Sequence, residues 1–239
     1  HAEPSGFMAA GLDLGKNVNL TLQLGRGFRE ATLSDRFYRG LTGRGVITGN
    51  PDLVPETSRQ ADLALRWTGH RVQLGASAYL YRIKDLIERY KADGAYWFRN
   101  RGEAELRGLE IEATVELAER MALQMGLWWE HGEVRGSGDP VDDIPAPGLF
   151  AALRRTTASG LWWMVRGRVL TRKTRPGPSE QEVPGYATLD AGLGMALGNH
   201  LELRLLGRNL LDRRHLDSND ENAVLAPGRS VVLSVGARM

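Results

Sequence analysis

Residues 17–24 read Asn-Val-Asn-Leu-Thr-Leu-Gln-Leu and alternate polar with apolar side chains over four consecutive pairs. Side chains of a β-strand point alternately to opposite faces, so this period of two predicts a strand with one apolar face. The same period recurs at 62–67, 72–81, 109–117, 123–130, 161–169, 189–195, 201–205 and 231–237, and more weakly at 7–14 and 148–156. The sequence therefore predicts an all-β chain of about eleven strands with very little helix.

Acidic and basic residues are nearly balanced, with Lys+Arg 31 against Asp+Glu 29 and a formal net charge of +2. They alternate along most of the chain, whereas a nucleic-acid-binding domain usually concentrates its basic residues on one face. No nucleic-acid partner is therefore expected. The chain also has no cysteine, which excludes disulfides, thiolate metal sites and a cysteine nucleophile.

The sequence contains no uninterrupted apolar stretch near the roughly 18 residues that a membrane-spanning helix needs. Alternating strands average to an ordinary hydropathy and can still build a membrane β-barrel. Many of the predicted strands have the roughly 9 to 11 residues that cross a bilayer at a tilt. Glycine, at 29 of 239 residues, recurs between and within these runs, as expected of many strands and turns.

The predicted connections alternate between short and long. Short ones fall at 15–17, 68–70, 119–120, 157–160 and 198–200, and long ones at 28–58, 135–146, 174–185 and 211–228. The connection around 91–94 is of modest length and breaks the pattern. Outer-membrane barrels have short periplasmic turns and long external loops, so the alternation favours an antiparallel transmembrane β-barrel.

Two details of the strands give more specific expectations. Apolar residues fall on even positions at Ala104 and Leu106 but on odd positions at Leu109 and Ile111. One extra residue reverses the faces of a strand, so a β-bulge is expected at Gly108 and Leu109. Aromatic residues near predicted strand ends are either girdles at the two membrane interfaces or ordinary core packing. They are Trp97, Phe98, Trp128, Trp129, Trp162, Trp163 and Tyr186.

Three segments carry motifs beyond the alternation. They are residues 25–29 (GRGFR) with 49–58 (GNPDLVPETS), 100–104 (NRGEA) with 108–112 (GLEIE), and 209–212 (NLLD) with 227–229 (PGR). Their residues, order and spacing resemble the C-terminal half of the barrel of TonB-dependent outer-membrane receptors. With the strands between them, the resemblance covers essentially the whole chain.

This resemblance implies the C-terminal half of a barrel of about 22 strands with a plugged lumen, located in the bacterial outer membrane. Residues 1–239 are then all barrel. The signal peptide, the plug domain and the N-terminal half-barrel are expected elsewhere in a longer receptor, since none is visible in this sequence. Charged lumen residues such as Glu110, Glu112, Glu116, Arg166 and Arg168 are expected to bond the plug and one another.

The resemblance also implies the function and the partners. The function is binding and active import of a scarce nutrient, first of all a ferric siderophore, although haem, vitamin B12 and sugars are handled on the same scaffold. The partners are the receptor's own plug domain and N-terminal half-barrel, TonB through a segment outside this chain, and the lipid bilayer with its lipopolysaccharide. An iron chelate or a similar small ligand completes the set.

No constellation of catalytic or metal-binding residues is evident. The five histidines lack the close spacing of zinc motifs, and residues 136–138 (GSG) indicate a flexible loop and not a hydrolase nucleophile. The segment 139–143 (DPVDD) lacks the calcium-loop pattern with its terminal Glu, so a solvated external loop is expected. Neither an enzymatic activity nor a metal or other cofactor is expected.

The long loop at 28–58 combines cations and aromatic side chains on the expected extracellular side. Loops on rigid scaffolds often carry function. These residues, with two from the next external connection, are predicted to bind an anionic or aromatic iron chelate by charge pairing and stacking. They are Arg36, Phe37, Tyr38, Arg39, Arg44, Trp97 and Arg99. The alternative is loop solubility and contact with lipopolysaccharide phosphates.

Two other classes of protein remain open from the sequence. One is a passive pore or structural outer-membrane barrel assembled from several chains. The other is a soluble β-sandwich adhesin or lectin domain, which would have to bury its apolar faces against each other. Extraction separates them, because exposed apolar walls require detergent.

Overall fold

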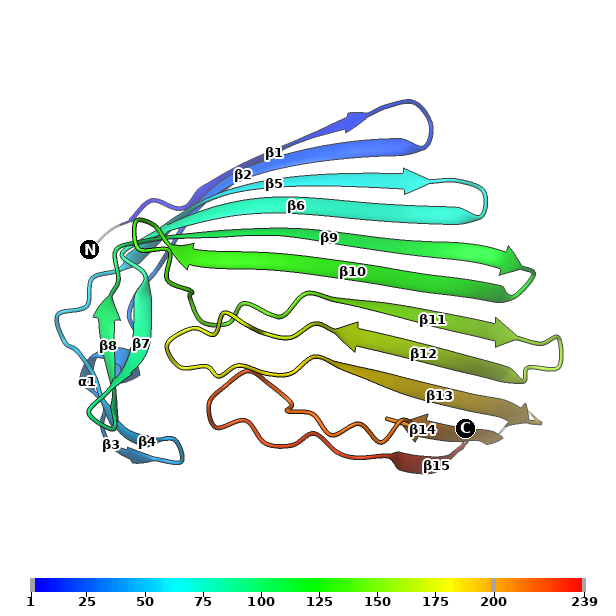
Figure 1. The fold of residues 1–239 in the computed structure, drawn as a ribbon. Coiled ribbons are helices and arrows are strands. Elements are labelled where there is room, and N and C mark those ends of the chain that lie inside the picture. The colour runs from blue at the N-terminus through cyan, green and yellow to red at the C-terminus, as the bar shows by residue number, and fades with distance from the viewer. Residues whose placement is uncertain (1–2, 199–200, 238–239) are drawn as a thin grey trace.

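The computed structural model describes residues 3–198 and 201–237, which form one curved antiparallel sheet and a small second sheet at one end (Figure 1). The large sheet has 11 strands in the order β1-β2-β5-β6-β9-β10-β11-β12-β13-β14-β15. Their bounds are β1 Gly6–Asp13, β2 Val18–Arg29, β5 Glu56–Thr68, β6 Val72–Lys84, β9 Glu103–Ala118, β10 Met121–Val134, β11 Gly148–Thr156, β12 Trp162–Leu170, β13 Tyr186–Leu197, β14 Leu201–Arg208 and β15 Ser230–Ala237. The predicted all-β class and the strand count are confirmed.

Helix is almost absent from the described residues. The helix α1 (Leu33–Phe37) has five residues. No helix among the described residues is long and apolar enough to cross a membrane.

The connections alternate as predicted, with short turns at one end of the wall and long loops at the other (Figure 1). The predicted short connection at 198–200 lies partly outside the described residues. One expectation is wrong. The connection around 91–94 is only the tip of a long loop at 85–102, which contains two strands of its own, β7 (Ile87–Ala92) and β8 (Ala95–Asn100). The apparent exception therefore belongs with the other long loops.

The outer face of the wall carries a broad apolar band, as β2 illustrates. Leu20, Leu22 and Leu24 lie on this face, and their cross-strand partners on β5 are also apolar. Leu22 remains 45% exposed, because no other part of the described chain covers this face. A sandwich would have buried these side chains, so the exposed band favours contact with a bilayer.

A small packed core lies under the long loops instead of along the wall. Ala104 of β9, Val134 of β10, and Val141 and Ile144 of the loop 135–147 are buried together. Leu106 packs against this cluster. The loop is therefore folded back onto the inner face of the wall at its outer end.

This core explains why the predicted bulge at Gly108 and Leu109 is absent. β9 keeps one unbroken register with β6 through these residues, with Tyr79 opposite Gly108. The apolar pattern changes because Ala104 and Leu106 point inward to the core, whereas later apolar residues point outward. The irregularity of β9 lies further along, where its register with β10 shifts between Met121 and Ala122.

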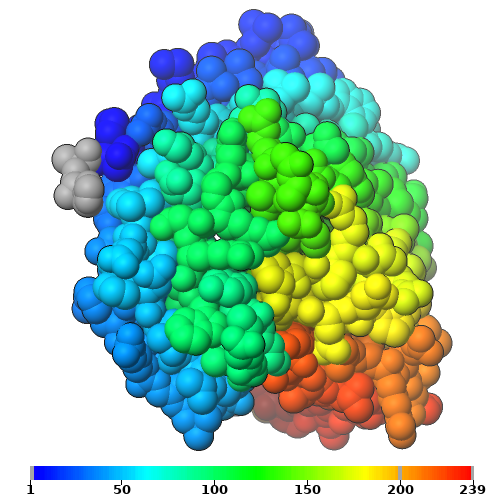
Figure 2. All heavy atoms as spheres, turned by 60° about the vertical axis from the view of Figure 1, so that its left-hand side comes forward, coloured from blue at the N-terminus to red at the C-terminus, as the bar shows by residue number. Residues whose placement is uncertain are grey.

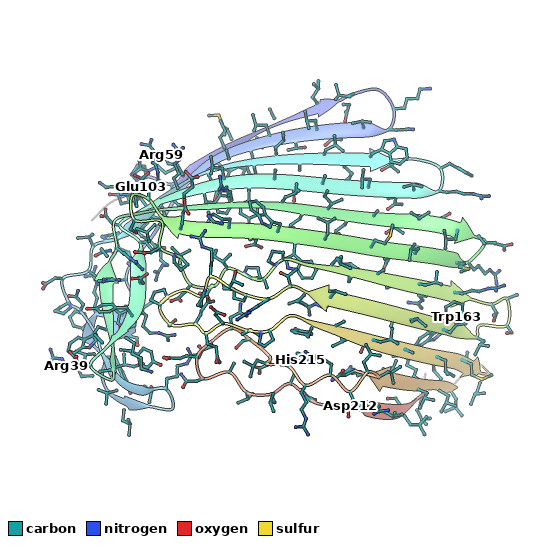
Figure 3. The ribbon with its side chains drawn as sticks, viewed as in Figure 1. Arg39, Arg59, Glu103, Trp163, Asp212 and His215 are labelled. Carbon is teal, nitrogen blue, oxygen red and sulfur yellow. The ribbon has the colours of Figure 1, made fainter. Side chains whose placement is uncertain are left out.

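The aromatic residues divide between the two faces, so the girdle expectation holds for only part of the set. Trp129 and Trp163 lie on the outer face near opposite ends of the wall, and Figure 3 shows Trp163 at the short-turn end. Trp128, Trp162 and Tyr186 have the opposite parity and lie on the inner face. Trp97 and Phe98 lie on β8, outside the wall. Girdles need outward side chains on the wall. The period of two excludes Trp128, Trp162 and Tyr186, and the position of β8 outside the wall excludes Trp97 and Phe98.

Candidate functional site

The outer loops fold into a four-stranded sheet of their own. β3 (Arg39–Thr42) and β4 (Gly45–Thr48) form a hairpin in the loop 30–55, and β7 and β8 form another in the loop 85–102. β4 pairs in parallel with β8, which places Ile47 opposite Tyr96. We call β3, β4, β8 and β7 the loop sheet. It lies at the long-loop end of the wall (Figure 1).

The helix α1 is held against the loop sheet by local contacts. Thr32 and Asp35 form a reciprocal capping box, with the Asp35 N–H donating to the Thr32 hydroxyl at 3.1 Å. The end of β4 lies very close to α1, because a Cβ at Gly49, the residue after β4, would lie 2.6 Å from the Arg36 carbonyl carbon. Only glycine permits this approach, and it fixes the segment that carries the predicted ligand-binding residues.

The structure brings all the predicted ligand-binding residues into this one unit. Arg36 and Phe37 end α1, Tyr38 follows it, Arg39 begins β3 and Arg44 lies in the β3–β4 turn. Trp97 and Arg99 lie on β8, with Trp97 directly opposite Thr48 of β4. Two loops separated in the sequence therefore bring their cations and aromatic rings together in the loop sheet and the helix beside it.

Three of the four predicted cations are already paired with carboxylates. Arg36 lies 3.6 Å from Glu30, and Arg44 forms an ion pair with Asp220. Arg99 lies 2.8 Å from Glu88 and also over the Tyr90 ring at 4.3 Å. Arg39 makes no ion pair with any described residue, and Figure 3 shows it at the end of the loop sheet far from the wall.

The three aromatic side chains of the predicted set are all exposed, Phe37 at 62% and Tyr38 and Trp97 at 38%. The Trp97 indole N–H donates to the Ala92 carbonyl at 3.3 Å, which fixes the ring at the β7–β8 hairpin. Rings presented in this way can stack on a planar ligand.

Glu88 is a structural centre of the site that the sequence did not indicate. Its side chain is almost fully buried and pairs with Arg99 and with Arg101, the latter at 2.6 Å. Arg101 also pairs with Asp139 of the loop 135–147 at 2.6 Å. Burial depresses the pKa of Arg101, but its bonds to Glu88 and Asp139 outweigh this and hold that pKa above its usual value. The pairs tie two loops together.

The loop sheet is also bound to the last outer loop, 209–229. The Tyr96 hydroxyl donates to the Glu221 carboxylate and accepts from the Asn222 side-chain amide at 3.2 Å. Lys91 pairs with Glu221 at 2.9 Å. Figure 2 shows the loop sheet abutting the loops that follow β12 and β14.

The segment 139–143 is not the solvated loop that was expected. Val141 is buried in the core, and the Asp142 carboxylate accepts from the Ser179 N–H at 3.0 Å and from the Ser179 hydroxyl at 2.8 Å. Burial raises the pKa of Asp142 above its usual value. The carboxylates of this segment serve loop docking, and no group of three or more potential metal ligands occurs in the described part of the chain.

Behind these contacts lies a cavity of about 880 Å³. Its lining comes from all five outer loops and is rich in carboxylates. It includes Asp35, Arg44, Glu88, Phe98, Asp142, Ser179, Glu180, Asn219 and Asp220. The loops thus form one interlocked cap over the outer end of the wall.

A family model described as "TonB dependent receptor-like, beta-barrel" matches residues 7–210. The chain belongs to the TonB-dependent receptor family. The iron-regulated outer membrane virulence protein of Vibrio cholerae is 28% identical over 194 residues, which are 72% of this chain and 30% of that protein. The vitamin B12 transporter BtuB of Vibrio vulnificus is 33% identical over 101 residues, which are 41% of this chain and 15% of that protein. The chain therefore spans less than a third of either relative.

Solved structures show the same fold. The copper transporter OprC has a TM-score of 0.85 at 20% identity, with 98% of this chain and 39% of that chain covered. The ferric yersiniabactin uptake receptor FyuA of Yersinia pestis has a TM-score of 0.74 at 20% identity, with 98% of this chain and 37% of that chain covered. The family comprises receptors and transporters, and it places this chain in the bacterial outer membrane.

The inner wall of this receptor barrel carries three stacks, each with an arginine over an aromatic ring. The stacks lie on the neighbouring strands β10, β11 and β12, and their arginines make no ion pair with any described residue. The pairs are Arg168 over Trp128 at 5.4 Å, Arg166 over Phe150 at 5.0 Å and Arg154 over Trp162 at 5.3 Å.

Each ring of these stacks occupies the space beside a glycine on the next strand. A Cβ added to that glycine would lie 2.3 Å from Trp128 at Gly148, 2.4 Å from Phe150 at Gly126 and 2.8 Å from Trp162 at Gly194. The glycines therefore allow the rings to lie down on the wall. This arrangement accounts for inward aromatics that looked like girdle residues in the sequence.

The expected ion pairs between lumen residues are not found within the described chain. Arg166 and Arg168 lie on β12, whereas Glu110, Glu112 and Glu116 lie on β9, with two strands between them. All five side chains are exposed on the concave sheet. Their bonding to a plug remains a proposal for the whole receptor.

Proposed function

We propose that this chain forms part of the wall and outer mouth of a receptor that binds a ferric siderophore and imports it actively with TonB. The observation that carries the proposal is the loop sheet, which sets the cations and rings of the segment 36–44 beside Trp97 on β8. The named functions of the iron-regulated relative and of the ferric yersiniabactin receptor support iron as the cargo. A vitamin B12 transporter and a copper transporter are also similar, so the test must compare nutrients.

The seven proposed binding residues divide into two roles. Phe37, Tyr38, Arg39 and Trp97 contact the ligand, because their side chains are exposed and Arg39 has no carboxylate partner among the described residues. Arg36, Arg44 and Arg99 hold the loops in place through their ion pairs. An anionic chelate would then meet Arg39 first and stack on the rings.

The remainder of the receptor is proposed to close the wall and fill its lumen. β1 and β15 each pair on one side only and run in the same direction, since the strands between them alternate. Unpaired edges are costly in lipid, so further strands pair with both. A plug domain then faces the inner wall, and a segment outside this chain pairs with TonB. Interlocked loops over the mouth favour such a receptor over an open pore.

The test uses the full-length receptor in iron-starved cells, with binding and uptake of a radiolabelled ferric siderophore as the two readouts. Arg39→Ala and Trp97→Ala are each expected to weaken ligand binding by about tenfold, the loss expected for one desolvated cation or stacking contact. Arg71→Ala, which removes an exposed arginine from the short-turn end, is the matched control and should bind normally.

Three results would count against the proposal. Unchanged affinity in both variants would remove the loop-sheet site. Uptake of vitamin B12 in place of the siderophore would change the nutrient. Uptake that persists in cells without TonB would favour a passive pore.

A further inference from the structure

Three arginines lie side by side on the outer face of the wall, near its extracellular end. Arg26 of β2 is directly opposite Arg59 of β5, and Arg59 is directly opposite Arg82 of β6. Figure 3 shows Arg59 at the long-loop end of the sheet. The adjacent row on the same face, two residues along each strand, is apolar and consists of Leu24, Ala61 and Leu80.

The parity of the strands assigns these arginines to the outside. Gly25 and Gln60, which precede and follow the arginines, are paired on the other face, and a Cβ at Gly25 would lie 2.7 Å from the Gln60 side-chain nitrogen. That contact is therefore on the lumen side. The arginines share the bilayer side with the leucines.

A row of like charges is unfavourable by itself. Directly opposite side chains on an antiparallel pair have Cβ atoms about 5 Å apart, where equal charges repel. Arg26 is offset by Glu3 at 2.7 Å and Arg82 by Glu105 at 3.3 Å. Arg59, between them, makes no ion pair or side-chain hydrogen bond with any residue that the structure describes. The middle of the row thus carries an uncompensated positive charge.

The arginines line a groove of about 990 Å³ on this outer face. Ala61 and Leu80 line its apolar part, which continues into the apolar band of the wall. Lys84 also lines the groove but lies 3.9 Å from Asp85, and Glu103 pairs with Arg135 at 2.9 Å. Arg59 is therefore the lining cation without a carboxylate partner among the described residues. The groove therefore offers an apolar surface toward the bilayer and one uncompensated positive charge, on Arg59, just beyond it.

We infer that this groove binds an anionic lipid of the outer leaflet. A headgroup phosphate lies on Arg59 between Arg26 and Arg82, and an acyl chain follows Leu80 and Leu63 down the wall. The planar guanidinium fork suits a phosphate, and the phosphate removes the repulsion within the row. This inference depends on the outer-membrane location of the wall and not on which nutrient is imported.

Native mass spectrometry of the full-length receptor, released from nanodiscs of known lipids, tests the inference. The probes are phosphatidylglycerol and bis-phosphorylated lipid A in a phosphatidylcholine background. The unmodified receptor should retain anionic lipid, and Arg59→Gln should bind it about tenfold more weakly, because charge-assisted bonds to the phosphate are lost. Arg172→Gln, which removes an exposed arginine of another outer loop, should bind lipid normally.

Melting temperatures in detergent provide a second measurement, in which the loss of Arg59 should not destabilise the lipid-free receptor. Without lipid, Arg59→Gln should melt at the same temperature as the unmodified receptor or higher, because the repulsion is relieved. Added anionic lipid should raise the melting temperature of the unmodified receptor and leave that of Arg59→Gln unchanged. Arg59→Lys, which keeps the charge and loses the fork, should retain part of the shift.

Several outcomes would overturn the inference. Equal retention of anionic lipid by Arg59→Gln and the unmodified receptor would remove Arg59 from any lipid site. Equal binding of phosphatidylcholine would show that the charge row has no role. Full displacement of the lipid by inorganic phosphate would reveal a simple anion site without an acyl-chain contribution.

Discussion

The Tyr96 hydroxyl donates a hydrogen bond to the Glu221 carboxylate and joins two outer loops 125 residues apart in the sequence. The Tyr96 ring is 1% exposed and lies under the cations of Arg89 and Lys91, at 5.2 and 5.4 Å. This contact anchors the loop sheet to the loop 209–229. It also connects the first two outer loops of the cap to the last one.

Tyr96→Phe should loosen that anchor while keeping the packing of the ring. Glu221 and Asn222 would lose a buried partner, which costs about 1–2 kcal/mol of local stability. Hydrogen exchange of residues 85–102 and 209–229 should accelerate, and exchange in the wall strands should not change. Tyr90→Phe is the control, since the Tyr90 hydroxyl makes no hydrogen bond with any described residue. Equal exchange in both variants would show that the contact has no anchoring role.

Glu88→Gln should destabilise the cap more than the loss of an exposed ion pair would. Glu88 is buried between Arg99 and Arg101, and removing its charge leaves two guanidinium groups partly unpaired. Because both arginines are partly exposed, we expect a loss of about 2 kcal/mol and not the full cost of a buried pair. Thermal unfolding followed by tryptophan fluorescence measures the change. Glu182→Gln, which breaks the exposed pair with Arg172, should cost no more than about 0.5 kcal/mol.

Acidification should release the contact between the loop sheet and the loop 209–229. Burial raises the pKa of Asp220, but the Asn222 N–H and the cations of Arg44 and Arg89 outweigh this and hold that pKa below its usual value. A carboxylate whose pKa is depressed in the folded state stabilises that state above the unfolded pKa of 3.8. This stabilisation is lost as the pH falls through the folded pKa.

Exchange of residues 209–229 measured between neutral pH and below pH 3.8 tests this release. Protection should fall below the usual aspartate pKa in the unmodified receptor. Asp220→Asn should show the weakened contact already at neutral pH. The raised pKa of Asp142 acts in the opposite direction, because its contribution is lost as the pH rises, so Asp142 is not the source of an acid release.

Gly148→Ala should displace the Trp128 ring from the inner wall. The new Cβ would lie 2.3 Å from the indole, so the ring and Arg168 above it must move. We expect a loss of about 1–3 kcal/mol, as for other overpacked sites, and a shift in tryptophan emission. Gly75→Ala is the matched control on the same face, where a Cβ meets nothing within 4 Å. Similar stability of both variants would show that the ring adapts without cost.

The wall could be predicted from the sequence because its signal is local. The period of two at residues 17–24 fixes which side chains share a face, and it recurs in every wall strand. The alternation of short and long connections follows from the positions of these strands. The family motifs, such as residues 100–104 with 108–112, lie within or next to these strands.

The alternation of side chains misleads where the environment of one face changes along a strand. The change of apolar phase in β9 looked like a bulge, but the register is continuous through Gly108 and the inner face becomes apolar under a loop. Trp128 and Trp162 looked like girdle residues until the parity of their strands and the glycines beside them showed the inner face.

What the sequence by itself determined is therefore the barrel wall, because the alternation of polar and apolar side chains is a property of neighbouring residues. Only the tertiary structure decided the cap, in which Ile47 meets Tyr96, Glu88 meets Arg101 and Tyr96 meets Glu221. These pairs join loops whose own sequences carry no period. Such contacts depend on where the wall strands bring the loop ends, and that position exists only once the wall has formed.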